Sequence, residues 1–152
     1  MTRHTINRLP TTVAQLRRCN DLLRLLTGQL ADLLAEPAEN ATTQCVVELL
    51  DAMLDNLREQ FRLEEEQDYL ADVLQQYPNW HPEVEHLRQQ HSLLHNQLRD
   101  IRRRVAAAGD RPTVRYQTRR QLRDWINTYN EHERRETQLI QDAFTLETGA
   151  GE

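Results

Sequence analysis

The chain has 152 residues, which suits a single domain that buries about 70% of its unfolded surface without help from disulfides. Its 19 basic residues, all arginines, stand against 24 acidic residues and give a net charge of −5, which argues against nonspecific binding to nucleic acid. Four glycines, five prolines and 5% aromatic residues leave little material for a β-sandwich or barrel, so an all-α fold is predicted.

The sequence carries no sign of export or membrane insertion. The N-terminal residues MTRHTINRLPTT lack the apolar stretch of a signal peptide, and no run of apolar residues is long enough for a membrane span. Cys19 and Cys45 form no CxxC pattern, so neither a zinc knuckle nor a disulfide framework is indicated. We therefore expect a soluble, cytoplasmic protein without a membrane partner.

Two long helices are predicted in the first half of the chain. The segment PTTVAQ, a proline followed by a capping box, predicts a helix start near Thr12, and the helical pattern continues to about Ala35 before PAEN breaks it. A second helix is predicted from about Ala41 to about Gln76, where YPNWHP, with two prolines, stops it.

Two more helices are predicted in the second half. The third opens at Pro82, carries Glu83 and Glu85 where the helix dipole favours acidic groups, and ends at the segment AAAG. The fourth follows GDRP and continues to about Leu146. Because connections of a few residues force consecutive helices to be antiparallel, the pattern predicts an up-down-up-down four-helix bundle.

One domain over residues 1–152 is expected, with its core at about 11–146. Each predicted helix has a seam of apolar residues at alternating steps of three and four, the spacing that buries one face of a helix in a bundle. Helix patterning alone does not separate a wide core stripe from a subunit interface. A homodimer therefore stays open as an alternative.

Polar residues interrupt all four seams. They are Asn20 on the first helix, Gln60 and Glu64 on the second, His91 on the third, and His132 and Glu136 on the fourth. Counted from the connecting loops, their heights agree to within about one helical turn, roughly 5–6 Å. These side chains are therefore predicted to lie in one polar layer of the core.

A metal ion would satisfy such a layer. An ionised carboxylate buried alone is very costly, whereas iron, manganese and zinc accept neutral imidazole and carboxylate as ligands. The spacing of four residues between His132 and Glu136 also brings their side chains to one point. The alternative is a metal-free polar core in which Gln60 and Asn20 hydrogen-bond the histidines and a carboxylate is protonated.

Three segments on these seams resemble a known family. They are LREQFRLEEE (Leu57–Glu66), HPEVEHLRQQHSLLHNQL (His81–Leu98) and NEHERRETQLI (Asn130–Ile140). In these segments the chain resembles the hemerythrin-like (HHE cation-binding) proteins, four-helix bundles that hold a non-haem di-iron centre. The resemblance implies metal ligands at Glu64, His91, His132 and Glu136. The family's histidines on the first and second helices fall on Asn20 and Gln60.

The two replaced histidines serve the same iron in that family. The resemblance therefore implies an altered, mononuclear site, with iron expected first and zinc or manganese as alternatives. His95, one turn beyond His91, is a further candidate ligand, and Tyr129 is placed one turn before His132, close enough to hydrogen-bond a ligand.

The expected function is binding or sensing of oxygen, nitric oxide or iron, so the expected partners are a metal ion and a small diatomic ligand. The alternative is a metal-free bundle that acts as an interaction or regulatory module. An enzymatic role has less support, because no serine or cysteine shares a seam with a histidine at a suitable height and no glycine-rich phosphate loop is present.

Overall fold

The computed structural model describes residues 2–67, 75, 78–108 and 111–150. The long helices in these residues are α1 (Thr2–Ala35), α2 (Thr43–Gln67), α4 (His81–Ala107) and α5 (Tyr116–Ala150), and two 3₁₀ turns are η1 (Ala38–Asn40) and η2 (Pro78–Trp80). The described part contains no β-strand, only one backbone bridge between Thr42 and Thr113. Among its helices, none is both long and apolar enough to cross a membrane. The predicted all-α fold is confirmed.

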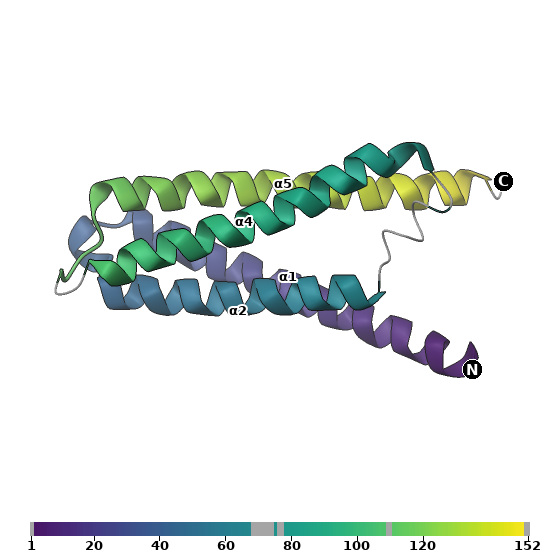
Figure 1. Ribbon diagram of the computed structural model, residues 1–152, viewed down its shortest axis with the longest axis horizontal. Coiled ribbons are helices and arrows are strands. Elements are labelled where there is room, and N and C mark those ends of the chain that lie inside the picture. Colours follow the sequence, from purple (N-terminus) through teal and green to yellow (C-terminus); the bar gives the residue numbers. More distant parts are fainter. Residues whose placement is uncertain (1, 68–74, 76–77, 109–110, 151–152) are drawn as a thin grey trace.

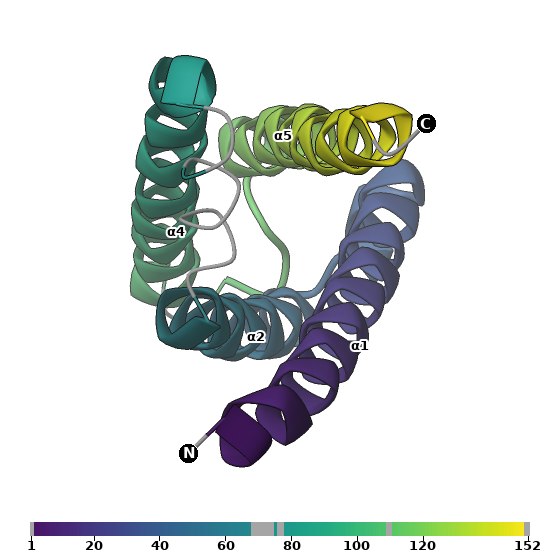
Figure 2. The ribbon, with the colours of Figure 1, turned by 90° about the vertical axis from the view of Figure 1, so that its right-hand side faces the viewer.

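The four long helices form a bundle in which neighbours in sequence are neighbours in space. Helix α1 packs against α2 and α5, and α4 packs against α2 and α5, so that the helices stand around a common axis (Figure 2). Consecutive helices run in opposite directions, while the N-terminal part of α1 extends away from the other three (Figure 1). This is the predicted up-down-up-down arrangement.

The starts of two helices differ from the prediction, and the predicted end of another lies outside the described residues. Helix α1 begins at Thr2 and passes through Pro10, because a proline inside a helix removes one hydrogen bond and can kink the helix without ending it. Helix α2 is described to Gln67, and most of the rest of its predicted length, 68–74 and 76, lies outside the described residues. Helix α5 begins only at Tyr116.

The late start of α5 follows from contacts between the two loops at one end of the bundle. The amide of Thr43 donates to the carbonyl of Pro112 at 3.0 Å, and the amide of Val114 donates to the carbonyl of Ala41 at 3.2 Å. These bonds hold the segment before α5 extended against the start of α2. They also fix the heights of α2 and α5 relative to each other, and so the height of the polar layer.

Arginines of α5 hold the C-terminal end of α1 at the same end of the bundle. The buried Arg119 donates through Nη2 to the carbonyls of Leu34 and Glu36 at 2.8 and 3.2 Å, and Arg123 donates to Leu34 at 2.6 Å. The last carbonyls of a helix have no partner within the helix, so these guanidinium groups satisfy them. The register of α1 against α5 is fixed in this way.

Among the described residues, two apolar clusters fill the core, one on each side of the polar layer. The larger cluster takes buried side chains from all four helices, among them Leu30, Leu50, Leu98 and Leu122. The smaller cluster consists of Val84, Leu87 and Leu139, with Trp80 packed against it. Each fully buried aliphatic side chain contributes roughly 1.5–3 kcal/mol. The polar layer is therefore held between two packed regions.

Candidate metal centre

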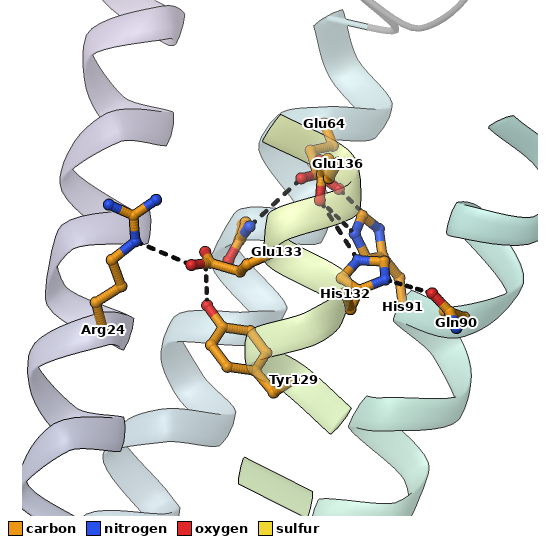
Figure 3. A network of polar contacts seen from close by, with 9 residues as sticks. Arg24, Glu64, Gln90, His91, Tyr129, His132, Glu133 and Glu136 are labelled. Atoms are coloured by element: carbon orange, nitrogen blue, oxygen red, sulfur yellow. Dashed lines mark hydrogen bonds and ion pairs between the residues drawn. The ribbon is translucent and has the colours of Figure 1, made fainter. Parts of the chain in front are cut away.

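The ring of His91 on α4 is the centre of the polar layer (Figure 3). Its Nδ1 lies 3.1 Å from Oε2 of Glu64 on α2, and its Nε2 lies 3.1 Å from Oε2 of Glu136 on α5. Nε2 of His132, one turn before Glu136, lies 3.4 Å from the same carboxylate oxygen. The centroids of the two imidazole rings are 4.5 Å apart. Three helices thus bring two imidazoles and two carboxylates together.

These four side chains are well removed from solvent. The side chain of His132 is 2% exposed, and those of His91, Glu64 and Glu136 are 11–12% exposed. One potential ligand atom from each of His91, His132 and Glu136 lies within 4.8 Å of the others. Nε2 of His132 is buried and has no hydrogen-bond partner among the described residues. This donor set and the free ring nitrogen fit a transition-metal ion.

In the metal-free layer, His91 also offsets the negative charge of the two carboxylates. Burial disfavours the imidazolium, but hydrogen bonds to Glu136 and Glu64 and the charges of these carboxylates outweigh burial and raise the pKa of His91 to about 10. Burial raises the pKa of Glu64, and the hydrogen bond from His91 opposes this shift. A protonated His91 therefore compensates the buried negative charge when no metal is bound.

The stability of the metal-free protein should fall as pH rises above neutrality. His91 has a higher pKa in the folded chain, about 10, than its ordinary value of 6.5, so its contribution is complete below pH 6.5 and is lost as pH rises through 10. The free energy of unfolding should fall by at most about 1.4 kcal/mol per pH unit. Urea unfolding of chelator-treated protein at pH 6, 7, 8 and 9 measures it.

The matched variants for this measurement are His91→Gln and His86→Gln. His86 is an exposed histidine on the same helix, so its replacement should leave the slope unchanged, whereas His91→Gln should flatten it. An equal slope in wild type and His91→Gln would show that the charge on His91 contributes nothing to the pH dependence of stability.

The two amides predicted at the layer do not bond the histidines in the way the metal-free alternative required. Gln60 is 5% exposed, and its Nε2 donates to Oε1 of Glu64 at 3.5 Å. Its Oε1, and Oδ1 of Asn20, are buried without a hydrogen-bond partner in the described part of the chain. The carboxylates bond His91 instead.

Tyr129 hydrogen-bonds to Glu133, which is not one of the candidate ligands. Its buried hydroxyl donates to Oε1 of Glu133 at 2.8 Å, and Oε2 of Glu133 accepts from Nε of Arg24 on α1 at 2.9 Å (Figure 3). Glu133 is the residue next to His132. This network connects α1 to α5 beside the layer.

His95 lies outside the group of candidate ligands. The ring of Phe61 lies against two histidines of α4, stacked on His91 with centroids 5.0 Å apart and at an angle to His95 with centroids 6.0 Å apart. His95 lines a surface hollow of about 510 Å³ together with Phe61 and charged residues of α2. Its predicted ligand role stays a prediction.

Gln90 is a residue of the site that the sequence did not reveal. Its Oε1 lies 2.7 Å from Nδ1 of His132, across the α4–α5 interface (Figure 3). Gln90 lies off the apolar seam of its helix, and the only available signal was its position directly before His91, which puts it at the height of the layer.

An antiparallel four-helix bundle with histidines and carboxylates converging in its core defines a class of metal-binding helical proteins. Within this class the chain belongs to the hemerythrin HHE cation-binding domain family, whose model matches residues 11–143. The comparisons gave no match to a curated protein or to a solved structure. The family and the candidate site at His91, His132 and Glu136 together indicate a metal-binding protein.

Proposed function

We propose that this protein binds a single metal ion through Glu64, His91, His132 and Glu136, with iron as the first candidate and zinc or manganese as alternatives. The observation that supports this most directly is the convergence of ligand atoms from His91, His132 and Glu136 within 4.8 Å, with Nε2 of His132 buried and unpartnered in the described structure. Glu64 lies next to this group, with its Oε2 3.1 Å from Nδ1 of His91.

The proposal of one ion rests on Asn20 and Gln60. They occupy the places of the two family histidines that serve one iron of the pair. Amide oxygens are weaker ligands than imidazole for iron and zinc. Both amide oxygens are nevertheless buried without a partner in the described structure, which suits a water molecule or a weakly held group rather than a second tightly bound ion.

A bound iron ion would supply a redox-active centre of the kind that binds small ligands such as oxygen or nitric oxide. The chain itself would supply two carboxylates to offset the charge of the ion, two imidazoles, and the Phe61 ring that covers His91. Binding or sensing of oxygen, nitric oxide or iron is the role we propose. Reversible oxygen carriage by an iron pair is not proposed, because one position lacks its histidines.

Elemental analysis tests this function. Purified protein is loaded with ferrous iron under anaerobic conditions, freed of excess metal and assayed for iron per chain, and its absorbance spectrum is compared before and after exposure to air. The expected result is one iron per chain and a spectrum that changes with air. Protein that retains no iron, zinc or manganese after such loading would contradict the proposal.

A second candidate function, a metal-free interaction or regulatory module, is favoured by one observation. His91 bonds both Glu64 and Glu136, so a protonated imidazole satisfies the carboxylates without any ion. The two candidates differ in their response to chelation, because a metal that binds only the folded chain stabilises it. A melting temperature that a strong chelator leaves unchanged, in freshly purified protein, would favour the metal-free module.

A further inference from the structure

We propose that Gln90 is a positioning residue that fixes the tautomer of His132, so that the Nε2 lone pair of His132 faces the metal. This inference rests on the proposed function. It assigns a role to a residue that is not itself a proposed metal ligand. It also predicts that metal affinity depends on the hydrogen bond between Gln90 on α4 and His132 on α5.

The geometry of the contact is that of a strong hydrogen bond. Oε1 of Gln90 and Nδ1 of His132 are 2.7 Å apart, at the short end of the range for nitrogen and oxygen partners. An amide oxygen can only accept, so the hydrogen lies on Nδ1. A neutral imidazole has one N–H, and Nε2 therefore carries a lone pair.

The other ring nitrogen points toward the candidate ligands. Nε2 of His132 lies 3.4 Å from Oε2 of Glu136, yet it makes no hydrogen bond in the described structure. A hydrogen on Nε2 would be buried without an acceptor in the described structure and would close that nitrogen to a metal. With the hydrogen held on Nδ1 by Gln90, the lone pair of Nε2 is instead available at the point where His91 and Glu136 converge.

An amide suits this position for an electrostatic reason. Metal-bound histidines usually donate their second N–H to a carboxylate, a carbonyl or water, and loss of such a partner typically costs 10–100-fold in metal affinity. Two carboxylates already lie in this layer. Gln90 orients His132 with a neutral oxygen and adds no third negative charge to a buried site.

The first test compares zinc affinity in variants of the full-length chain. Gln90→Leu removes the acceptor at similar size, and Gln89→Leu is the matched control, since Gln89 is the exposed neighbour on the same helix. Competition with a zinc chelator should show a 10–100-fold weaker Kd for Gln90→Leu and an unchanged Kd for Gln89→Leu. Gln90→Glu, which keeps an acceptor, should bind zinc at least as tightly as Gln90→Leu binds it. Equal affinity of Gln90→Leu and wild type would overturn the proposal.

The second test reads the tautomer directly and does not need a bound metal. Nitrogen-15 NMR of histidine-labelled, metal-free protein reports which ring nitrogen of His132 carries the hydrogen. We expect Nδ1 in wild type and in Gln90→Glu, and a shift toward Nε2 in Gln90→Leu. A hydrogen on Nε2 in wild type would overturn the role of Gln90. In that case the amide nitrogen of Gln90, not its oxygen, would face Nδ1 of His132.

The two tests separate the inference from the function on which it rests. If wild type binds no zinc and no iron, the proposed function fails, while NMR still decides whether Gln90 sets the tautomer. If wild type binds metal and Gln90→Leu binds it equally well, the function stands and the positioning role fails. Should Gln90→Leu not fold, the NMR measurement on wild type alone still decides which ring nitrogen of His132 carries the hydrogen.

Discussion

Replacing His132 with alanine is expected to weaken metal binding by more than about 100-fold, because loss of an outer partner of a ligand already costs 10–100-fold. His132 is the least exposed member of the layer, and its Nε2, a candidate ligand atom, has no hydrogen-bond partner among the described residues. Its removal leaves His91 and the carboxylates, which can bond one another without an ion. Iron and zinc content after loading, and chelator competition, measure the loss.

The matched control for this variant is His86→Ala. His86 is an exposed histidine of α4, so its replacement removes an imidazole without touching the layer and should leave one metal per chain. Since an empty space in the core is itself destabilising, His132→Gln serves as a variant of similar volume, and circular dichroism confirms that both are folded. Full metal content in folded His132→Ala and His132→Gln would remove His132 from the site.

The fold could be predicted from the sequence because its main determinants are local. Apolar residues at steps of three and four define the buried face of each helix, and segments such as YPNWHP and GDRP predict helix ends. A helix rises by a fixed length per residue, so counting from the loops also gave the heights of Glu64, His91 and His132. The convergence of these side chains follows from the same count.

The contacts within the layer could not be predicted in the same way. A seam pattern tells which face of a helix is buried, but not how far a side chain reaches across to the next helix, which depends on crossing angle and rotamer. Gln90 and Glu133 lie off the seams, yet they bond His132 and Tyr129. The double contact of His91 with Glu64 and Glu136 was missed for the same reason.

Spacing along one helix leaves the role of His95 open. One helical turn separates it from His91, which makes it a candidate ligand, while its place beside the seam also fits a boundary residue. The ring of Phe61, on the neighbouring helix, packs against both rings, and His95 borders a hollow at the surface. A pattern within one helix cannot show which side chain of the adjacent helix packs against its residues.

Restoring both histidines, in the double variant Asn20→His with Gln60→His, is expected to raise the metal content from one ion to two per chain. Imidazole and the glutamine side chain have similar volumes, so the buried position 60 can accept the change, and Asn20 is only partly buried. The buried amide oxygens, which have no hydrogen-bond partner among the described residues, would be replaced by nitrogen ligands of the kind iron and zinc prefer.

Iron and zinc per chain after anaerobic loading measure this effect, with three controls. Each single variant should keep one ion, because one imidazole alone holds a second ion poorly, and Gln44→His, at an exposed glutamine of α2, should also keep one. A folded double variant that still binds one ion would show that a single-ion site is not explained by the presence of Asn20 and Gln60 in place of the two family histidines. Two ions in the double variant and one in every control would identify these two residues as the feature that sets the number of metals, because no carboxylate or α4 histidine differs among the proteins compared.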